Sequence, residues 1–415
     1  MKKIRDAMVG YAARFYDLGF CSENSCFAVK LNERSFMLCS LPCDRKITSD
    51  DVVIVVMDDF CASGKLHDLA AFFYDLFLYR KDVWTAGIFN SNYSDKVREE
   101  GKTIPPILDD MCQILATKIV CAKGLNISDV LDAMRGGNAC HVNGVGMLVA
   151  ERSLDELLTA AQALEKSAKT YLLAKRIGGA KHISKFRAWA EHIVFKNVYS
   201  VQNQKLQRAS EGINDLFDAK FAPTKSRDTD FEGEKRALIV DTLKKLSDDN
   251  LVLGTWGNVS LRIDDKLMLC SPKGIGYNIL RPQDIAVVNI QTLENKGGIT
   301  ASSEKGIHAG ILKRFPHINA VIHAHPVYAG IFSAAHKDLT VESEDDRKLL
   351  GGVVRSTVYA SPSTRALTKQ TLRALDGNRA AFMANHGIVV CGENIEQAYA
   401  ALVRLEELCK EAIGE

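Results

Sequence analysis

The chain has 415 residues, of which 47% are hydrophobic and 25% are charged, as in ordinary globular proteins of two to three domains. Its 53 Lys and Arg nearly balance its 51 Asp and Glu, leaving a formal net charge of +2. This balance argues against non-specific nucleic-acid binding, which needs an excess of cationic side chains to neutralise phosphates.

The N-terminus and the cysteines favour a cytoplasmic protein. The first twenty residues carry two lysines and two arginines but no long apolar run, so we expect no signal peptide. No apolar stretch reaches the ~20 residues needed to span a bilayer, so we expect no membrane partner. The 11 cysteines are read as reduced thiols. Cys21, Cys26, Cys39 and Cys43 lie in hydrophobic stretches, which favours small buried side chains over a zinc knuckle.

Two halves of the chain resemble each other, which predicts a tandem repeat. The run from Met37, MLCSLPCDRKITSDDVVIVVMDD, parallels LMLCSPKGIGYNILRPQDIAVVNI from Leu267. Near the end of each half, GGNACHVNGVGMLVAERSL parallels DGNRAAFMANHGIVVCGENI. The predicted organisation is therefore a first domain over 1–205, a linker over 206–229 and a second domain over 230–415.

The same elements are predicted in both halves: an N-terminal helix, short strands, helices, a strand pair and a C-terminal helix. In the second half, 320–325 and 380–390 have the composition of strands, whereas 309–315 and 395–410 have helical spacing. Residues 153–208 are basic and mostly helical, which we interpret as a solvated helical face.

The second half carries a candidate metal site. His323 and His325 are two residues apart in a predicted strand, so both imidazoles project from the same face. His386 lies in a turn between apolar runs, where a side chain can point into a cleft. Three histidines leave the fourth position of a tetrahedral metal open, as catalytic zinc sites require.

Small polar residues nearby are typical of an anion site. Ser302 and Ser303 precede Glu304, and this run predicts a helix start capped by one of the serines, with Glu304 favoured by the helix dipole. Free N–H groups at such a helix start hold anions. The turns GTWGNVS (254–260) and SPKG (271–274) add backbone N–H groups that can cradle a phosphate.

Taken in order, these motifs resemble the class II aldolase and adducin family, whose members include enzymes like fuculose-phosphate aldolase and ribulose-phosphate 4-epimerase. The pattern G-T-x-G-N-x-S, a proline-glycine turn, S-S-E, H-x-H-P and N-H-G runs over residues 254–387. The resemblance covers the second half and extends in degenerate form to the first. It implies an α/β fold class with two tandem three-layer α/β/α domains, each around a mainly antiparallel sheet.

The resemblance also implies the site residues. One Zn²⁺, or another divalent metal, per chain would bind His323, His325 and His386, with Glu304 as the catalytic acid/base. The phosphate-binding residues implied by the family are Thr255, Gly257, Asn258, Ser271, Lys273, Gly274, Ser302 and Ser303. Lys273 departs from the usual T-P-S-G turn and adds a positive charge.

The implied chemistry is lyase chemistry on a small phosphorylated sugar or related hydroxy-carbonyl compound. The metal would act as a Lewis acid that stabilises an enediolate, while Glu304 moves the proton during retro-aldol cleavage. A 4-epimerase or dehydratase reaction on the same site and a non-enzymatic adducin-like scaffold are the alternatives. Aldolases of this family use tyrosines that the stretch TVESEDDRKLLGG (340–352) lacks, although Asp345 or Asp346 is available there.

The first half is expected to have lost the metal site. Aligning the strands places Ile88 opposite His323 and Asn90 opposite His325, while Gly144-Val145-Gly146 replaces the N-H-G motif. We read His67 and His141 as structural. Because related aldolases form four-fold rings with a site at each subunit boundary, we expect a homo-oligomer, in particular a dimer that forms a pseudo-four-fold ring.

Overall fold

The computed structural model describes residues 1–56, 65–195 and 230–415. The chain divides into two compact units. The first unit comprises residues 1–172 and 184–193; the second comprises residues 173–183 and the described residues from 194 to 415. The predicted linker, 206–229, and the predicted domain end at 205 lie outside the described residues.

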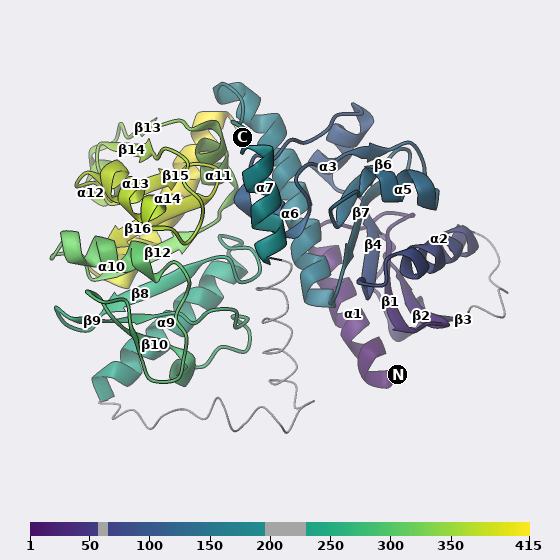
Figure 1. The fold of residues 1–415 in the computed structure, drawn as a ribbon, viewed down its shortest axis with the longest axis horizontal. Helices are drawn as coiled ribbons and strands as arrows, with labels where there is room; N and C mark the ends of the chain where they lie inside the picture. The colour runs from purple at the N-terminus through teal and green to yellow at the C-terminus, as the bar shows by residue number, and fades with distance from the viewer. Residues whose placement is uncertain (57–64, 196–229) are drawn as a thin grey trace. The chain divides into compact units, whose positions relative to one another are not determined.

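The first unit contains a seven-stranded sheet in the order β3-β2-β1-β4-β7-β6-β5. All its described strand pairs are antiparallel except β5 with β6, which is parallel. Figure 1 shows this unit in purple to teal. Its elements are α1 (Lys2–Asp17), β1 (Cys26–Asn32), β2 (Ser35–Ser40), β3 (Val52–Val56), α2 (Lys65–Tyr79), β4 (Thr85–Phe89), α3 (Asn92–Glu99), α4 (Asp109–Ile114), β5 (Cys121–Ala122), α5 (Ile127–Ala133), β6 (Ala139–Val142), β7 (Gly146–Glu151), α6 (Leu154–Leu173) and α7 (Lys185–Val194).

The second unit contains a nine-stranded sheet in the order β11-β10-β9-β8-β12-β16-β15-β14-β13. Here too the described pairs are antiparallel except one, β14 with β15. Its elements, green to yellow in Figure 1, are α9 (Asp230–Asp248), β8 (Asn258–Arg262), β9 (Leu267–Cys270), β10 (Ala286–Asn289), β11 (Asn295–Lys296), α10 (Lys305–Arg314), β12 (Ala320–Ala324), α11 (Val327–Ala335), β13 (Leu339–Thr340), α12 (Glu344–Leu350), β14 (Val353–Ser356), α13 (Arg365–Leu375), β15 (Ala380–Met383), β16 (Gly387–Gly392) and α14 (Ile395–Ile413).

Helices cover both faces of the second sheet. The buried apolar side chains of α10 and α13 pack against alternate residues of the central strands, including Val321 and Val389. On the other face, α9, α11 and α14 pack against β8, β12 and β16; there Phe332 of α11 stacks on Phe382 of β15 with ring centroids 5.4 Å apart. Because His323 lies two residues after Val321, strand alternation turns it toward the face that α10 and α13 cover.

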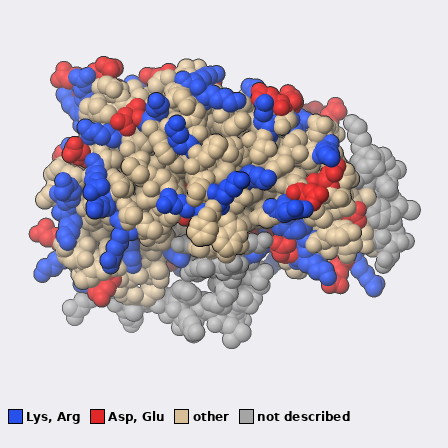
Figure 2. Space-filling model, turned by 45° about the horizontal axis from the view of Figure 1, so that its top comes forward, with Lys and Arg blue, Asp and Glu red and all other residues tan. Residues whose placement is uncertain are grey.

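The strand order confirms an α/β fold with a mixed, mainly antiparallel sheet in each half of the chain. The predicted helices over 309–315 and 395–410 correspond to α10 and α14, and the described part of the basic segment, 153–195, is mostly helical. On the face that Figure 2 shows, Lys and Arg side chains are interspersed with Asp and Glu. Within the described ranges, no helix has the length and apolar character needed to cross a membrane.

Candidate metal centre

His323 and His325 reach the same point from two different elements. His323 is in β12, paired with Asn258 of β8 on one side and Val389 of β16 on the other. β12 ends at Ala324, so His325 lies one residue beyond the strand, just before α11. The prediction that 320–325 forms a strand was therefore one residue too long, because Pro326 begins the turn into α11 and has no N–H to continue the ladder.

His386 is held by a tight hairpin between β15 and β16. Met383 pairs with Gly387, which leaves a three-residue loop with Asn385 in the left-handed region at φ 58°. The Asn385 side chain fixes this loop. Its Oδ1 lies 2.6 Å from Nε2 of His336, and its Nδ2 donates to the carbonyl of Lys181 at 2.8 Å. Asn is among the few residues that adopt this conformation readily, and here it orients the neighbouring His386.

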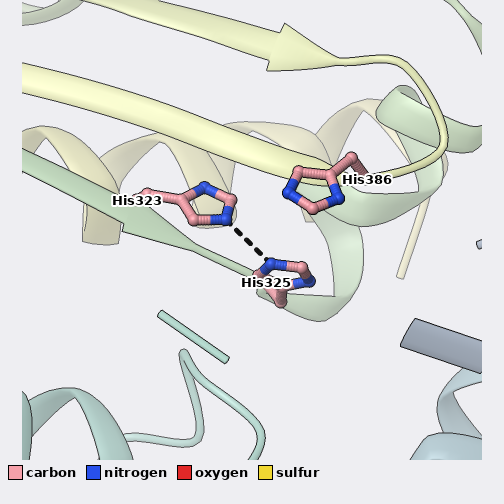
Figure 3. A group of neighbouring side chains, drawn as sticks. All are labelled: His323, His325 and His386. Atoms are coloured by element: carbon pink, nitrogen blue, oxygen red, sulfur yellow. Dashed lines mark hydrogen bonds between the residues drawn. The ribbon is translucent and has the colours of Figure 1, made fainter. Parts of the chain in front are cut away.

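The three imidazoles form a compact triangle (Figure 3). Their ring centroids are 4.7 to 5.0 Å apart, and one candidate ligand atom from each ring lies within 4.8 Å of the others. The side chains are 1%, 4% and 4% exposed, respectively, for His323, His325 and His386. The structure thus brings together all three histidines that the sequence proposed as metal ligands.

The hydrogen bonds of His323 indicate that a cation fits this triangle. Its Nδ1 lies 2.8 Å from the carbonyl of Ile388, which can only accept, so Nδ1 carries a proton. Nε2, on the other side of the ring, faces Nε2 of His325 at 2.9 Å and Oε2 of Glu304 at 2.9 Å. Three electron-rich atoms at these distances repel one another unless a proton or a metal ion lies among them. The donor set of imidazole nitrogen and carboxylate oxygen suits zinc.

The carboxylate of Glu304 contacts two of the three imidazoles. It bridges His323, through the contact above, and Nε2 of His386 at 3.0 Å. Burial favours the neutral carboxyl, but the charges and hydrogen bonds of His323 and His386 outweigh it and lower the pKa of Glu304 well below its usual range. The group is therefore an anion within reach of the position where a metal would bind.

The predicted cap of α10 was wrong. Glu304 itself is the N-cap of α10, and the helix has no side-chain cap hydrogen bond. Ser302 Oγ instead accepts from the Glu304 N–H at 3.2 Å, a local turn that positions the carboxylate at the helix start. The Ser302 hydroxyl is thus bonded within the turn that precedes α10, and the first N–H groups of α10 have no side-chain cap.

Some of the residues that were predicted to bind phosphate lie side by side in the structure. The N–H of Ser302 donates to the carbonyl of Ser271 at 2.9 Å, and Ser271 Oγ accepts from the N–H of Val259 at 3.1 Å, beside Asn258. These bonds join the turns after β9 and before α10 to the start of β8. Thr255 and Gly257 precede β8, while Lys273 and Gly274 follow β9.

Gly257 is required by close packing as well as by its backbone angle, which has φ 157°. A Cβ there would lie 2.5 Å from Cγ1 of Val252 and 3.3 Å from the carbonyl oxygen of His323. The turn before β8 therefore runs directly against the strand that carries the histidine.

Two buried residues near the site were missed from the sequence. His308 lies one turn after Glu304 in α10; its Nε2 bonds to Asn258 Oδ1, and its Nδ1 lies 2.7 Å from Ser260 Oγ. Burial, followed by the charge of His323, lowers the pKa of His308 to about 3, so the ring is neutral. Tyr277 is also buried and donates its hydroxyl to the carbonyl of Gly257 at 2.7 Å. The i+4 spacing from Glu304 to His308 was the available signal.

Because Asn258 Oδ1 can only accept, Nε2 of His308 donates to it, and Nδ1 accepts from the Ser260 hydroxyl. This chain of hydrogen bonds fixes the side-chain amide of Asn258 and leaves its NH₂ group as the donor for any other partner. His308 and Tyr277 therefore orient groups that the sequence assigned to an anion site.

A buried triangle of imidazoles with an adjoining carboxylate, carried by a mixed α/β sheet, defines the second unit as a candidate metalloenzyme domain. Residues 237–413 match the family described as "Class II Aldolase and Adducin N-terminal domain". An L-fuculose phosphate aldolase of Methanococcus vannielii is 34% identical over 168 residues, which make up 40% of this chain and 88% of that relative. The chain belongs to the class II aldolase and adducin family.

Other relatives carry similar names. A 5-methylthioribulose-1-phosphate/5-deoxyribulose-1-phosphate aldolase of Rhodospirillum rubrum is 28% identical over 173 residues, covering 42% of this chain and 77% of its own. The L-fuculose phosphate aldolase of Escherichia coli is 30% identical over 160 residues, covering 39% and 74%. Among solved structures, an L-fuculose 1-phosphate aldolase aligns with a TM-score of 0.41 and 29% identity over 44% of this chain and 88% of its own.

Proposed function

We propose that the second unit is a metal-dependent lyase that cleaves a small phosphorylated ketose by a retro-aldol reaction. The observation that carries this proposal is the convergence of Nε2 of His323, Nε2 of His325 and the Glu304 carboxylate at 2.9 Å contacts. The names of the relatives, which act on fuculose phosphate and on ribulose phosphates, support the substrate class.

His323, His325 and His386 would hold one Zn²⁺ or another divalent cation. Such a cation supplies Lewis-acid polarisation of a carbonyl oxygen when it is bound. Their burial keeps bulk water away from the reacting atoms and strengthens the electrostatic interactions there. The bond from His323 Nδ1 to the Ile388 carbonyl keeps Nε2 available and the ring correctly oriented.

Glu304 would move the proton. In retro-aldol cleavage, the hydroxyl next to the breaking carbon–carbon bond loses its proton, and the carbon fragment that is released gains one. Glu304 is anionic, buried and at hydrogen-bond distance from two imidazoles, so it can accept a proton and return it without bulk solvent. Asn258, Ser271, Ser302 and the neighbouring turns would bind the phosphate.

The test is cleavage of L-fuculose 1-phosphate and of 5-deoxyribulose 1-phosphate, followed by the release of dihydroxyacetone phosphate. We expect Glu304→Gln to keep the metal and to lose about 10²–10⁴-fold in kcat. The control is Glu344→Gln, which changes an exposed carboxylate of α12 and leaves kcat unchanged. Full activity of Glu304→Gln would show that another group moves the proton.

One observation favours an epimerase or dehydratase as a second candidate. Asp345 and Asp346, which the sequence offered in place of the missing tyrosine, form ion pairs with Lys348 at 3.0 Å and Arg404 at 2.8 Å. Both carboxylates are therefore engaged in ion pairs and are not available to transfer a proton to a leaving group. Conversion of a pentulose phosphate to its C4 epimer, without release of dihydroxyacetone phosphate, would identify this alternative. Absence of bound metal would support the non-enzymatic scaffold.

We further infer that the first unit is a degenerate tandem copy. The order β3-β2-β1-β4-β7-β6-β5 matches β10-β9-β8-β12-β16-β15-β14, with the parallel pair at the same place. Ile88 pairs with Leu148, which lies two residues after Gly146 of the hairpin pair Val142–Gly146. In the same way, His323 pairs with Val389, which lies two residues after Gly387 of the hairpin pair Met383–Gly387.

In this register, Ile88 takes the position of His323 and Val145 that of His386. Ile88 is fully buried in an apolar cluster with α2 and α5 side chains, and neither side chain can bind a metal ion. Asn90, at the position of His325, instead bonds to Asp95 and to the Val145 carbonyl. A purified chain should therefore hold one metal ion and not two.

A further inference from the structure

A second polar feature of this unit lies between α10 and α13. The two helices run parallel and close together, because Gly306 and Gly310 leave room for Thr368. A Cβ on Gly306 would lie 3.5 Å from Thr368 Oγ1, and one on Gly310 would lie 3.0 Å from Thr368 Cγ2. The outer side of this contact is a cavity of about 680 Å³, a size typical of small-molecule sites. We name it the α10–α13 groove.

Cationic side chains line the groove along its length. Arg365, Lys369 and Arg373 are four residues apart and exposed, so they form one stripe along α13. The stripe extends about 12 Å at a rise of 1.5 Å per residue. Lys305 lines the groove near the start of α10 and Arg314 near its end. Among the described residues that line the groove, only Glu304 and Asp376 are acidic, against these five cations.

Most of these cations lack a carboxylate partner. Within the described residues, no Asp or Glu oxygen lies within 4.0 Å of Arg314, Arg365, Lys369 or Arg373. Asp376 is already engaged, at 3.4 Å from Arg355. Several other arginines of the same unit are paired with carboxylates: Arg281 with Asp284, Arg379 with Glu393 and Arg404 with Asp346. Unbalanced positive charge therefore gathers around one cavity.

The groove ends at the candidate metal centre. Because α10 and α13 are parallel, their N-termini, with positive dipole ends, lie at the same end of the groove. Glu304 and Ser303 line that end, and Thr364 caps α13 there by accepting from the N–H of Leu367 at 3.2 Å. An anion in the groove would thus lie beside the carboxylate that faces the histidines.

We propose that the α10–α13 groove is a second anion-binding site, which takes a phosphate or carboxylate group in addition to the phosphate held by the turns near Asn258. The anion can be a group of the substrate itself, on the end of the substrate that is distant from the metal. In that case the inference rests on the proposed function. The substrate would then be a doubly anionic sugar. A free inorganic anion is the other source of the same chemistry.

The experiment compares binding of 5-deoxyribulose 1-phosphate, ribulose 1,5-bisphosphate and inorganic phosphate to the full chain by calorimetry. The variant is the triple substitution Arg365→Gln, Lys369→Gln and Arg373→Gln, whose exposed positions leave the core untouched. The matched control is Lys313→Gln, an exposed cation of α10 outside the groove. Metal content and cleavage activity are measured in parallel, so failure of the proposed function is seen separately.

We expect the wild-type chain to bind the bisphosphate at least about tenfold more tightly than the deoxy monophosphate, and the triple variant to lose this preference. Loss of inorganic-phosphate binding in the triple variant, with no preference for the bisphosphate in the wild type, would assign the site to a free anion. Identical binding of all three compounds by the wild type and the triple variant would overturn the proposal, whatever the metal content.

Discussion

A single methyl group at Gly387 should disrupt the metal centre without changing any ligand. Gly387 opens β16 directly after His386, where it faces the end of β12. A Cβ at this position would lie 2.6 Å from the carbonyl oxygen of Ala324, 3.2 Å from Cε1 of His323 and 3.3 Å from Cδ2 of His325. The carbonyl belongs to the backbone, so the strand must move to accommodate an alanine.

The cost of Gly387→Ala follows from these distances. Overpacking of a well-packed interior costs about 1–3 kcal/mol in the free energy of unfolding. The added methyl group would also press on both imidazole rings, whose Nε2 atoms lie 2.9 Å apart, so we expect the metal dissociation constant to rise at least about tenfold. Chemical unfolding gives the first quantity, and competition with a chromophoric chelator gives the second.

The first unit provides a matched control. Gly146 opens β7 at the corresponding place, and a Cβ there would meet the carbonyl oxygen of Phe89. Gly146→Ala should therefore cost a similar free energy of unfolding but leave the metal dissociation constant unchanged. Equal metal affinity in the wild type and Gly387→Ala would refute the reasoning, because it would mean that the histidines tolerate a shift of the adjoining strand.

Three further predictions concern other parts of the chain. His308→Phe should raise the KM for a phosphorylated ketose with metal content unchanged, because Asn258 Oδ1 and Ser260 Oγ lose their partner; an unchanged KM would exclude a positioning role. Burial, then the charge of Arg98, lowers the pKa of His141 to about 4, so the unfolded chain binds a proton that the native chain excludes between about pH 6.5 and 4. Stability should fall by about 3 kcal/mol as the pH drops through this range, and His141→Phe should flatten this dependence in urea unfolding at several pH values. The proposed ring predicts a dimer or larger assembly in light scattering, whereas a stable, fully active monomer would contradict it.

Much of the site could be predicted because its signals are local in sequence. His323, His325, His386 and Glu304 each stand in a short motif, and the structure brings all four together. The spacing of His323 and His325 in the strand-like run 320–325 predicted that both project from one face, and the family resemblance implied His386 as the third ligand. The family resemblance likewise implied a mainly antiparallel sheet in each half, and each sheet has one parallel strand pair among its described pairs.

What escaped prediction depends on contacts between distant segments. The hydrogen bond from His308 to Asn258 joins residues 50 positions apart, so the spacing from Glu304 could indicate His308 but not its partner Asn258. The cap of α10 was misassigned because Ser302 satisfies the preceding turn rather than the helix. The α10–α13 groove arises from the parallel packing of two helices, which helical periodicity in either segment does not specify.

The central claim is that three imidazoles of the second unit bind one cation. Its most direct test is the metal content of the purified full chain, measured by mass spectrometry for the wild type and for His386→Ala. The structure predicts about one divalent ion per wild-type chain and almost none in the variant. A wild-type chain that stays free of metal after incubation with Zn²⁺, or a variant that retains a full equivalent, would contradict the claim.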